Sequence, residues 1–158
     1  MTRRAATGFT LIEMVVVVAL VGILAAAAHP VVELGVRRTK ELQLRQSLRQ
    51  LREAIDAYKR ATLEGRIKAA ADASGYPPSL EALVDGVPVA DGPQSRKLYF
   101  LRRMPRDPFA APEVPAASTW RLRSADSPPD APQPGRDVFD VMSKAEGTGL
   151  DGTPYRSW

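Results

Sequence analysis

The feature that most limits how this chain can fold is an uninterrupted apolar run near its start. Fifteen consecutive uncharged, mostly aliphatic residues extend from Met14 to Ala28. In contrast, 13 of the 14 prolines come at Pro77 or later. A chain of 158 residues has the length of one modest domain. Because its apolar residues and prolines are segregated so unevenly, a uniform globule is excluded.

The composition excludes several kinds of catalytic and metal-binding site. Cysteine is absent and His29 is the only histidine. Disulfide frameworks, thiolate nucleophiles and cysteine zinc sites are therefore excluded, and a histidine triad or multi-histidine metal site has almost no basis. The 22 basic and 18 acidic residues include Arg3 and Arg4 at the start of the chain. This balance is too even to indicate binding of nucleic acid.

The first thirty residues have the layout of a secretory signal peptide, which is a short basic segment followed by an apolar stretch. A secreted periplasmic protein with a cleaved signal peptide is therefore one alternative. Glu13 argues against it, because an acidic residue at the centre of a membrane helix costs about 2.5–3.5 kcal/mol and is expected to have a partner. Helical patterning also continues past the apolar run to about Thr62, which a cleaved peptide would not need.

The residues around this glutamate carry a family resemblance. Residues 8–13, Gly-Phe-Thr-Leu-Ile-Glu, resemble the cleavage and methylation motif of type IV prepilins, which type IV pilins share with the pseudopilins of type II secretion. The resemblance implies that a membrane-embedded prepilin peptidase cuts between Gly8 and Phe9 and methylates the new Phe9 amine. It also implies a helix kink at Pro30, where many family members have a proline.

The mature N-terminus would suit a membrane and then a filament. Phe9 to Ala28 would form about 30 Å of helix, enough to span a bilayer. Arg3 and Arg4 would keep the leader cytoplasmic and deliver the rest to the periplasm. In a filament, Glu13 is expected to neutralise a Phe9 amine and so lower the desolvation cost of both. Phe9 and Glu13 are therefore the predicted assembly residues.

These features predict four segments. A leader peptide covers residues 1–8, a transmembrane and filament-core helix covers 9–29, an amphipathic periplasmic half of the helix covers 30–62, and a periplasmic globular head covers 63–158. The predicted location is the bacterial inner membrane, with a single span and the head in the periplasm, and afterwards a periplasmic filament.

The second half of the long helix has one apolar stripe. Its large apolar residues step by 4, 3, 4 and 3: Leu44, Leu48, Leu51, Ile55 and Tyr58. This spacing predicts an amphipathic helix whose stripe packs against its own domain. The charged residues of the other faces are interpreted as a solvated surface with i,i+4 ion pairs. These pairs are Glu41–Arg45, Arg49–Glu53, Arg52–Asp56 and Asp56–Arg60.

Beyond Gly65 the regular segments are short. Residues 78–84 read as a short helix with Ser79 as its N-cap. Residues 119–123 and 137–142 alternate as strands do, and a proline-rich loop over 126–135 separates them. We expect an α+β fold of the type IV pilin kind, in which a long N-terminal α-helix packs on a small antiparallel β-sheet head.

Three downstream segments resemble the major pseudopilin of type II secretion systems. They are Tyr-Pro followed by Leu-Glu-Ala-Leu-Val (76–84), a basic pair followed by proline, Asp-Pro and an aromatic residue (98–109), and Phe-Asp-Val before a glycine-rich end (139–152). We therefore expect a structural subunit of a type II secretion pseudopilus that drives protein export. A type IV pilus pilin, major or minor, is the alternative.

The resemblance also implies partners. They are the prepilin peptidase, further copies of the chain in a homo-oligomeric filament, minor pseudopilins, and an inner-membrane assembly platform with its ATPase. The chain itself has no phosphate-binding loop. An enzyme is the weakest interpretation, because the spacing of the candidate acids implies no convergence and we expect them on the surface or in turns. These acids are Asp107, Asp137, Asp140 and Asp151.

No cofactor is required by any of these features. The resemblance, however, implies calcium in the terminal loop, where family members bind it through acidic side chains and backbone carbonyls. The candidate ligands here are Asp140, Glu146 and Asp151. Calcium takes six to eight oxygen ligands. The alternative, which these few acids favour, is that the glycines permit tight turns while Tyr155 and Trp158 pack on the sheet.

Overall fold

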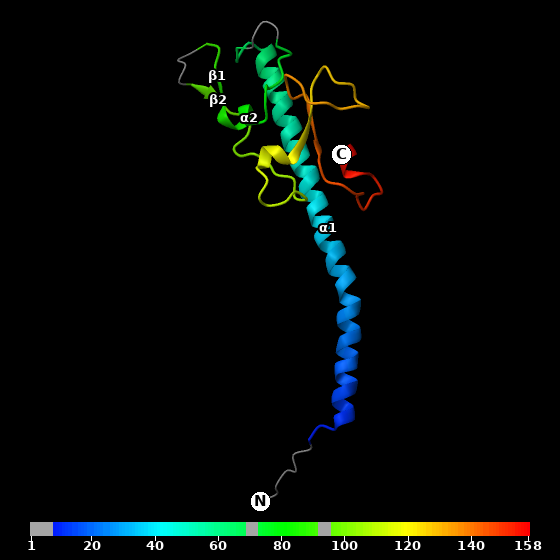
Figure 1. Ribbon diagram of the computed structural model, residues 1–158. Coiled ribbons are helices and arrows are strands. Elements are labelled where there is room, and N and C mark those ends of the chain that lie inside the picture. The colour runs from blue at the N-terminus through cyan, green and yellow to red at the C-terminus, as the bar shows by residue number, and fades with distance from the viewer. Residues whose placement is uncertain (1–7, 69–72, 92–95) are drawn as a thin grey trace, which may run out of the picture. The chain divides into compact units, whose positions relative to one another are not determined.

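The computed structural model describes residues 8–68, 73–91 and 96–158, and the side chains of residues 27–31 lie outside this description. The chain divides into two compact units, Met1–Thr39 and Lys40–Trp158. One helix, α1 (Leu11–Leu63), contributes residues to both units (Figure 1). The two units are described in turn.

The described part of the first unit is almost entirely the first half of α1. Thr10 precedes the helix, and its Oγ1 accepts a hydrogen bond from the backbone N–H of Glu13 at 3.3 Å. This is the N-cap arrangement expected for a threonine followed three residues later by glutamate. Every residue of this unit whose side chain is described is exposed. None of its described apolar side chains is therefore part of a buried core.

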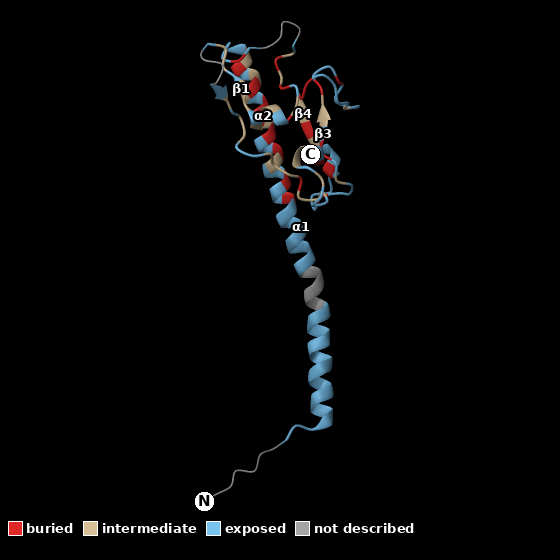
Figure 2. Ribbon diagram, turned by 60° about the vertical axis from the view of Figure 1, so that its left-hand side comes forward, coloured by how far each residue is buried: buried red, intermediate tan, exposed pale blue. Residues whose placement is uncertain are grey.

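The second unit has its core along the other half of α1, as the apolar stripe predicted. All five stripe residues are buried, from Leu44 to Tyr58, and Ala54 and Ala61 extend the buried face (Figure 2). Tyr58 packs against Phe100 with ring centroids 5.2 Å apart. The stripe is buried because the rest of the head folds over it.

Two strands of the head form the antiparallel pair that the sequence predicted. β3 (Trp120–Arg123) pairs with β4 (Asp140–Ser143), and Leu122 lies opposite Val141. Val141 and Trp120 are buried in the same core as the helix stripe. The α+β fold with a long helix and a small antiparallel sheet is therefore confirmed.

Other elements depart from the prediction. The short helix α2 spans Glu81–Asp85, and its N-cap is Leu80 without a side-chain hydrogen bond, so the prediction of Ser79 as the cap is wrong. Burial of the Leu80 side chain, which is 1% exposed, fixes this end of the helix. A second antiparallel pair, β1 (Val87–Pro88) with β2 (Lys97–Leu98), was not predicted, because two-residue strands carry no periodicity.

The Asp-Pro segment folds around a buried carboxylate. Asp107 is 1% exposed, accepts the N–H of Phe109 at 2.8 Å and accepts the hydroxyl of buried Ser143 at 2.5 Å. Its own N–H donates to Thr119 Oγ1 at 3.2 Å. Thr119 ends the short 3₁₀ helix η1 (Ala116–Thr119). Asp107 thus joins the Asp-Pro turn to the end of β4.

The proline-rich loop between β3 and β4 is closed at its base. Asp137 Oδ1 accepts the hydroxyl of Ser124 at 2.7 Å and the N–H of Ala125 at 2.9 Å. Within the loop, Ser124 N–H donates to the carbonyl of Gln133, and Gln133 N–H donates to Ser127 Oγ. Because Asp137 serves this closure, β4 begins three residues later than predicted.

Candidate functional sites: the N-terminal motif and the terminal loop

The N-terminal motif lies at the start of α1 and is open to solvent. Phe9 is 76% exposed, and Gly8 and Glu13 are also exposed. Residues 1–7 of the predicted leader lie outside the described residues. The Glu13 backbone is held by the Thr10 cap, so the glutamate sits in the first helical turn, where the helix dipole favours a negative charge.

Among the residues that the structure describes, no packing explains a glycine at position 8. A Cβ added there meets none of their atoms within 4 Å, and Gly8 is not among the glycines with positive φ. A side chain at this position would therefore be tolerated by the fold. A requirement for glycine would have to come from a molecule that recognises the motif.

The kink predicted at Pro30 falls among residues 27–31, whose side chains lie outside the described residues, and it stays a prediction. α1 is assigned as one helix from Leu11 to Leu63.

The apolar side chains of the first unit are exposed over several turns, including Leu11, Val18 and Leu24. Among the residues that the structure describes, no helix meets the length and hydropathy required to cross a membrane.

The second candidate site is the terminal loop, defined here as residues 144–158. Its turns are closed by its own backbone: Gly149 N–H donates to Thr153 O at 2.8 Å, and Tyr155 N–H donates to Gly147 O at 3.1 Å. Gly147 and Gly152 have φ values of 106° and 83°, which favour glycine. The loop ends in a short 3₁₀ helix, η2 (Tyr155–Ser157).

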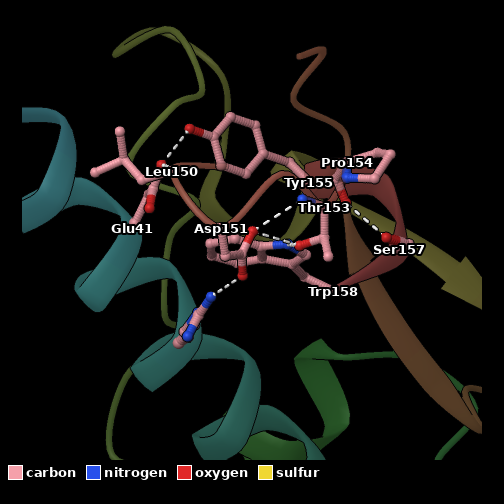
Figure 3. A network of polar contacts seen from close by, with 9 residues as sticks. Glu41, Leu150, Asp151, Thr153, Pro154, Tyr155, Ser157 and Trp158 are labelled. Atoms are coloured by element: carbon pink, nitrogen blue, oxygen red, sulfur yellow. Dashed lines mark hydrogen bonds and ion pairs between the residues drawn. The ribbon is translucent and has the colours of Figure 1, made fainter. Parts of the chain in front are cut away.

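A buried glutamate of α1 holds the middle of the terminal loop. Glu41 is 6% exposed, and its Oε1 accepts the hydroxyl of Tyr155 at 2.8 Å and the N–H of Leu150 at 2.9 Å. Figure 3 shows the tyrosine hydroxyl directed at this carboxylate. Tyr155 is itself buried and stacks on Phe109, with ring centroids 4.6 Å apart. Glu41 therefore organises the loop through two donors that are far from it in sequence.

One turn further along α1, Arg45 forms an ion pair with Asp151. The same guanidinium lies over the ring of Trp158, 4.2 Å from the centroid. Asp151 Oδ1 accepts both the hydroxyl and the N–H of Thr153, at 2.7 and 2.9 Å (Figure 3). These Thr153 bonds, followed by the nearby Arg45 charge, hold the pKa of Asp151 below its usual value.

A third side chain of α1, Arg52, binds the base of the loop. Its Nε donates to Asp140 Oδ1 at 2.8 Å, and its Nη2 donates to the backbone oxygens of Val141 at 3.1 Å and Trp158 at 3.0 Å. The guanidinium thus joins β4 to the end of the terminal loop. Glu41, Arg45 and Arg52 will be called the α1 clamp.

The three predicted calcium ligands do not form a cluster. Asp140 pairs with Arg52, Asp151 pairs with Arg45, and Glu146 is exposed beside a pocket lined by three basic side chains. These basic residues are Arg121, Lys144 and Arg156. Over the described ranges, no three histidine, cysteine, aspartate or glutamate side chains gather in a way that could hold a metal ion.

Sequence reasoning missed the α1 clamp. Its members were assigned to i,i+4 pairs on a solvated face, whereas the structure directs all three to the terminal loop. The available signal was their position beside the apolar stripe, since Arg45 and Arg52 directly follow Leu44 and Leu51, and Glu41 lies three residues before Leu44. Their partners lie more than 80 residues away, which spacing alone cannot reveal.

Two further acids are more buried than a surface position would allow. Asp107 and Asp137 were expected on the surface or in turns; both lie in turns or bends of the chain, but their exposure is only 1% and 4%. Both oxygens of Asp107 and Oδ1 of Asp137 accept hydrogen bonds from backbone N–H and serine hydroxyl groups, whereas Asp137 Oδ2 is buried without a partner among the described residues.

Comparison with known proteins places this architecture in a family. Residues 3–28 match the prokaryotic N-terminal methylation motif. The chain is 34% identical to the type II secretion system core protein G of Pseudomonas aeruginosa over 116 residues, which cover 71% of this chain and 74% of the relative. It is 30% identical to the type II secretion system core protein G of Aeromonas hydrophila, over 71% of this chain and 73% of the relative. No solved structure matches the chain. The chain therefore belongs to the family of type II secretion system core protein G, the major pseudopilins with a type IV pilin-like fold.

Proposed function

We propose that this protein is a structural subunit of a type II secretion pseudopilus. In this function, a prepilin peptidase removes residues 1–8, the new Phe9 amine is methylated, and the subunits assemble into a periplasmic filament that drives protein export. The observation that carries the proposal is the similarity to core protein G over 71% of the chain, together with the methylation motif at residues 3–28. The protein acts as a building block and a peptidase substrate, without a catalytic role of its own.

Before assembly, the segment from Phe9 to Ala28 anchors the subunit in the inner membrane, with the head in the periplasm. The helical part of this segment begins at Leu11; at 1.5 Å per residue, Leu11 to Ala28 is about 27 Å long, which is close to the hydrocarbon core of a bilayer. The exposed apolar side chains of the first unit support this proposal, since burying them in lipid removes them from water. On assembly the same side chains exchange lipid for the equivalent helices of neighbouring subunits.

Glu13 sets how neighbouring helices are aligned along one another in the filament. Lipid tails are as apolar as the aliphatic run, so helix association rests on packing and on polar pairs. The Glu13 carboxylate lies four residues from the Phe9 amine, roughly 6 Å along the helix axis. Pairing with a Phe9 amine, in its own or a neighbouring subunit, offsets the desolvation of both charges.

Extraction from the membrane requires energy from other components. We propose the inner-membrane assembly platform and its ATPase as this source, and minor pseudopilins as further partners of the filament. Calcium is not needed for any step of this proposal.

The proposal is tested by mass spectrometry of the subunit isolated from the cells that make it. The expected product begins at Phe9 and carries one additional methyl group. Gly8→Ala should abolish this processing and leave the head folded, because the fold has room for a Cβ at position 8. Gly22→Ala is the matched control, since a Cβ there also meets nothing within 4 Å, and it should be processed normally.

Two outcomes would contradict the proposal. A product that begins near His29 would identify the apolar run as a cleaved signal peptide. Normal processing of the Gly8→Ala variant would show that the motif is not what the peptidase recognises.

The assembly role of Glu13 is tested with Glu13→Val, which should be processed and yet fail to form filaments. A normal yield of filaments from this variant would contradict the pairing of Glu13 with the Phe9 amine.

A further inference from the structure

The oxygens of the terminal loop do not fit a calcium site. Calcium prefers several carboxylates among six to eight oxygen ligands, but Asp151 and Asp140 each face an arginine of α1. A guanidinium beside a carboxylate repels a divalent cation and neutralises the charge that would attract it. Glu41, the buried acid nearest the middle of the loop, already accepts two hydrogen bonds through Oε1.

Several backbone carbonyls of the loop also accept hydrogen bonds. Gly147 O accepts the N–H of Tyr155, and Thr153 O accepts the N–H of Gly149. Pro154 O accepts both the N–H and the hydroxyl of Ser157. Both lone pairs of Pro154 O are therefore in use, and a cation at the other two oxygens would share them with a donor already in place.

We infer that the α1 clamp takes the place of calcium in this protein, so that Glu41, Arg45 and Arg52 hold the terminal loop closed without a metal ion. Each member binds a different part of the loop. Glu41 fixes the middle through Leu150 and Tyr155, while Arg45 fixes the turn at Asp151. Arg52 fixes the end by binding the backbone oxygen of Trp158.

The charge pattern supports this inference. A cation held by several carboxylates would join acids to one another, whereas here each of two acids is joined to a base on the helix that forms the core. Arg45 makes a second contact that a calcium ion cannot make, because its guanidinium also lies on the Trp158 ring, 4.2 Å from the centroid. Trp158 in turn donates from Nε1 to Thr153 Oγ1 at 2.6 Å.

The test is hydrogen exchange of the full chain in detergent micelles, read by mass spectrometry on peptides from the terminal loop and from the β3–β4 pair. Exchange is measured in millimolar calcium, which would fill even a weak extracellular-type site, and in excess chelator. We expect the same exchange in the terminal loop under both conditions. A faster exchange of the loop in chelator would overturn the inference.

Variants then test the clamp itself. Glu41→Gln should accelerate exchange of the terminal loop by about tenfold, because a buried charged acceptor is weakened. Arg45→Gln should accelerate it by about fivefold, since it removes an exposed ion pair and a ring contact. Arg49→Gln is the control for Arg45, being an exposed arginine one turn further along α1. Loop exchange in the Arg45 variant equal to that of wild type would refute the role of the clamp.

A reversed pair separates the two explanations even if Glu41→Gln unfolds the head. Arg45→Asp alone should loosen the terminal loop, and the double variant Arg45→Asp with Asp151→Arg should restore protection. A calcium site predicts no restoration, because the second change removes a ligand. Failure of the double variant to regain protection while the β3–β4 peptides stay protected would contradict the proposed pairing.

Discussion

The strongest test of how the head is held together is the removal of the Asp107 carboxylate. This side chain is 1% exposed and accepts two hydrogen bonds, from the Phe109 N–H at 2.8 Å and from the Ser143 hydroxyl at 2.5 Å. Asp107→Ala leaves the buried Ser143 hydroxyl and the partly buried Phe109 N–H without this acceptor. An unsatisfied buried donor costs about 1–3 kcal/mol and a partly buried one costs less, so we expect a loss of roughly 2–5 kcal/mol in the free energy of unfolding.

The isosteric variant separates the charge from the shape. Asp107→Asn keeps an oxygen that can accept the Phe109 N–H, but it places an amide beside the Ser143 hydroxyl, which itself accepts the Ala145 N–H at 2.9 Å. The expected loss is about 1–2 kcal/mol, which is the order of one hydrogen bond to a charged group. The order of stability should therefore be wild type, then Asn, then Ala.

The assay is thermal unfolding of the full chain, followed by the fluorescence of its two tryptophans, Trp120 and Trp158. The Trp120 ring is 2% exposed, and its Nε1 donates to the carbonyl of Pro105, two residues before Asp107. At roughly 4 °C for each kcal/mol in a head of this size, Asp107→Ala should lower Tm by about 8–20 °C. Asp130→Asn, at an exposed position of the proline-rich loop, is the control and should leave Tm unchanged.

Two results would refute this reasoning. If the Asp107→Ala variant has the same Tm as wild type, the two donors have found other acceptors, and the carboxylate does not hold the turn to β4. If Asn and Ala are equally destabilised, the loss comes from repacking of the turn rather than from the number of unsatisfied donors.

Three further predictions follow from the described contacts. Burial acts to raise the pKa of Asp137, but hydrogen bonds from Ser124 and Ala125 and the Arg136 charge outweigh it, so the pKa lies below its usual value. The stability that Asp137 contributes is therefore complete above the ordinary aspartate pKa of about 3.8, and it is lost as the pH falls through the lower pKa of the native state. The difference in Tm between wild type and Asp137→Asn should close as the solution is acidified below the native pKa. Leu51→Ala, at 0% exposure on α1, should cost about 2–5 kcal/mol by denaturant unfolding, whereas Leu42→Ala, at 62% exposure on the same helix, should cost far less. Thr10→Val should speed hydrogen exchange at the start of α1 and Thr10→Ser should not, because only serine retains the oxygen that accepts the Glu13 N–H.

The parts of the fold that could be predicted were those determined by local pattern. The stripe from Leu44 to Tyr58 was recognised because burial on one helix face repeats every three or four residues, whatever covers that face. The β3–β4 pair was recognised from alternation. The start of β4 was placed too early, because the side chain of Asp137 is used to close a loop, and alternation does not record that use.

The terminal loop shows why the rest was missed. The ion pair of Arg45 with Asp151 joins residues 106 positions apart, and Tyr155 reaches Glu41 across 114 positions. In an isolated helix, Glu41 and Arg45 are i,i+4 neighbours, so the local interpretation accounted for both charges. In the folded head, residues of the terminal loop bind the same two side chains, and local spacing does not show this. At the N-terminal motif the reverse holds, since the match of residues 3–28 to the methylation motif was recognised from sequence alone.

The proline-rich loop between β3 and β4 is a suitable place to attach a label. Its base is fixed by Asp137 through Ser124 and Ala125, while residues 128–132 beyond that base are largely exposed. An insertion at the tip would lie beyond the hydrogen bonds that close the base of the loop. The register of β3 and β4 should therefore not change. A short epitope or a dye-labelled cysteine, which would be the sole thiol of the molecule, could therefore mark each head without disturbing its core. Such a tag would let subunits be counted and followed by light microscopy.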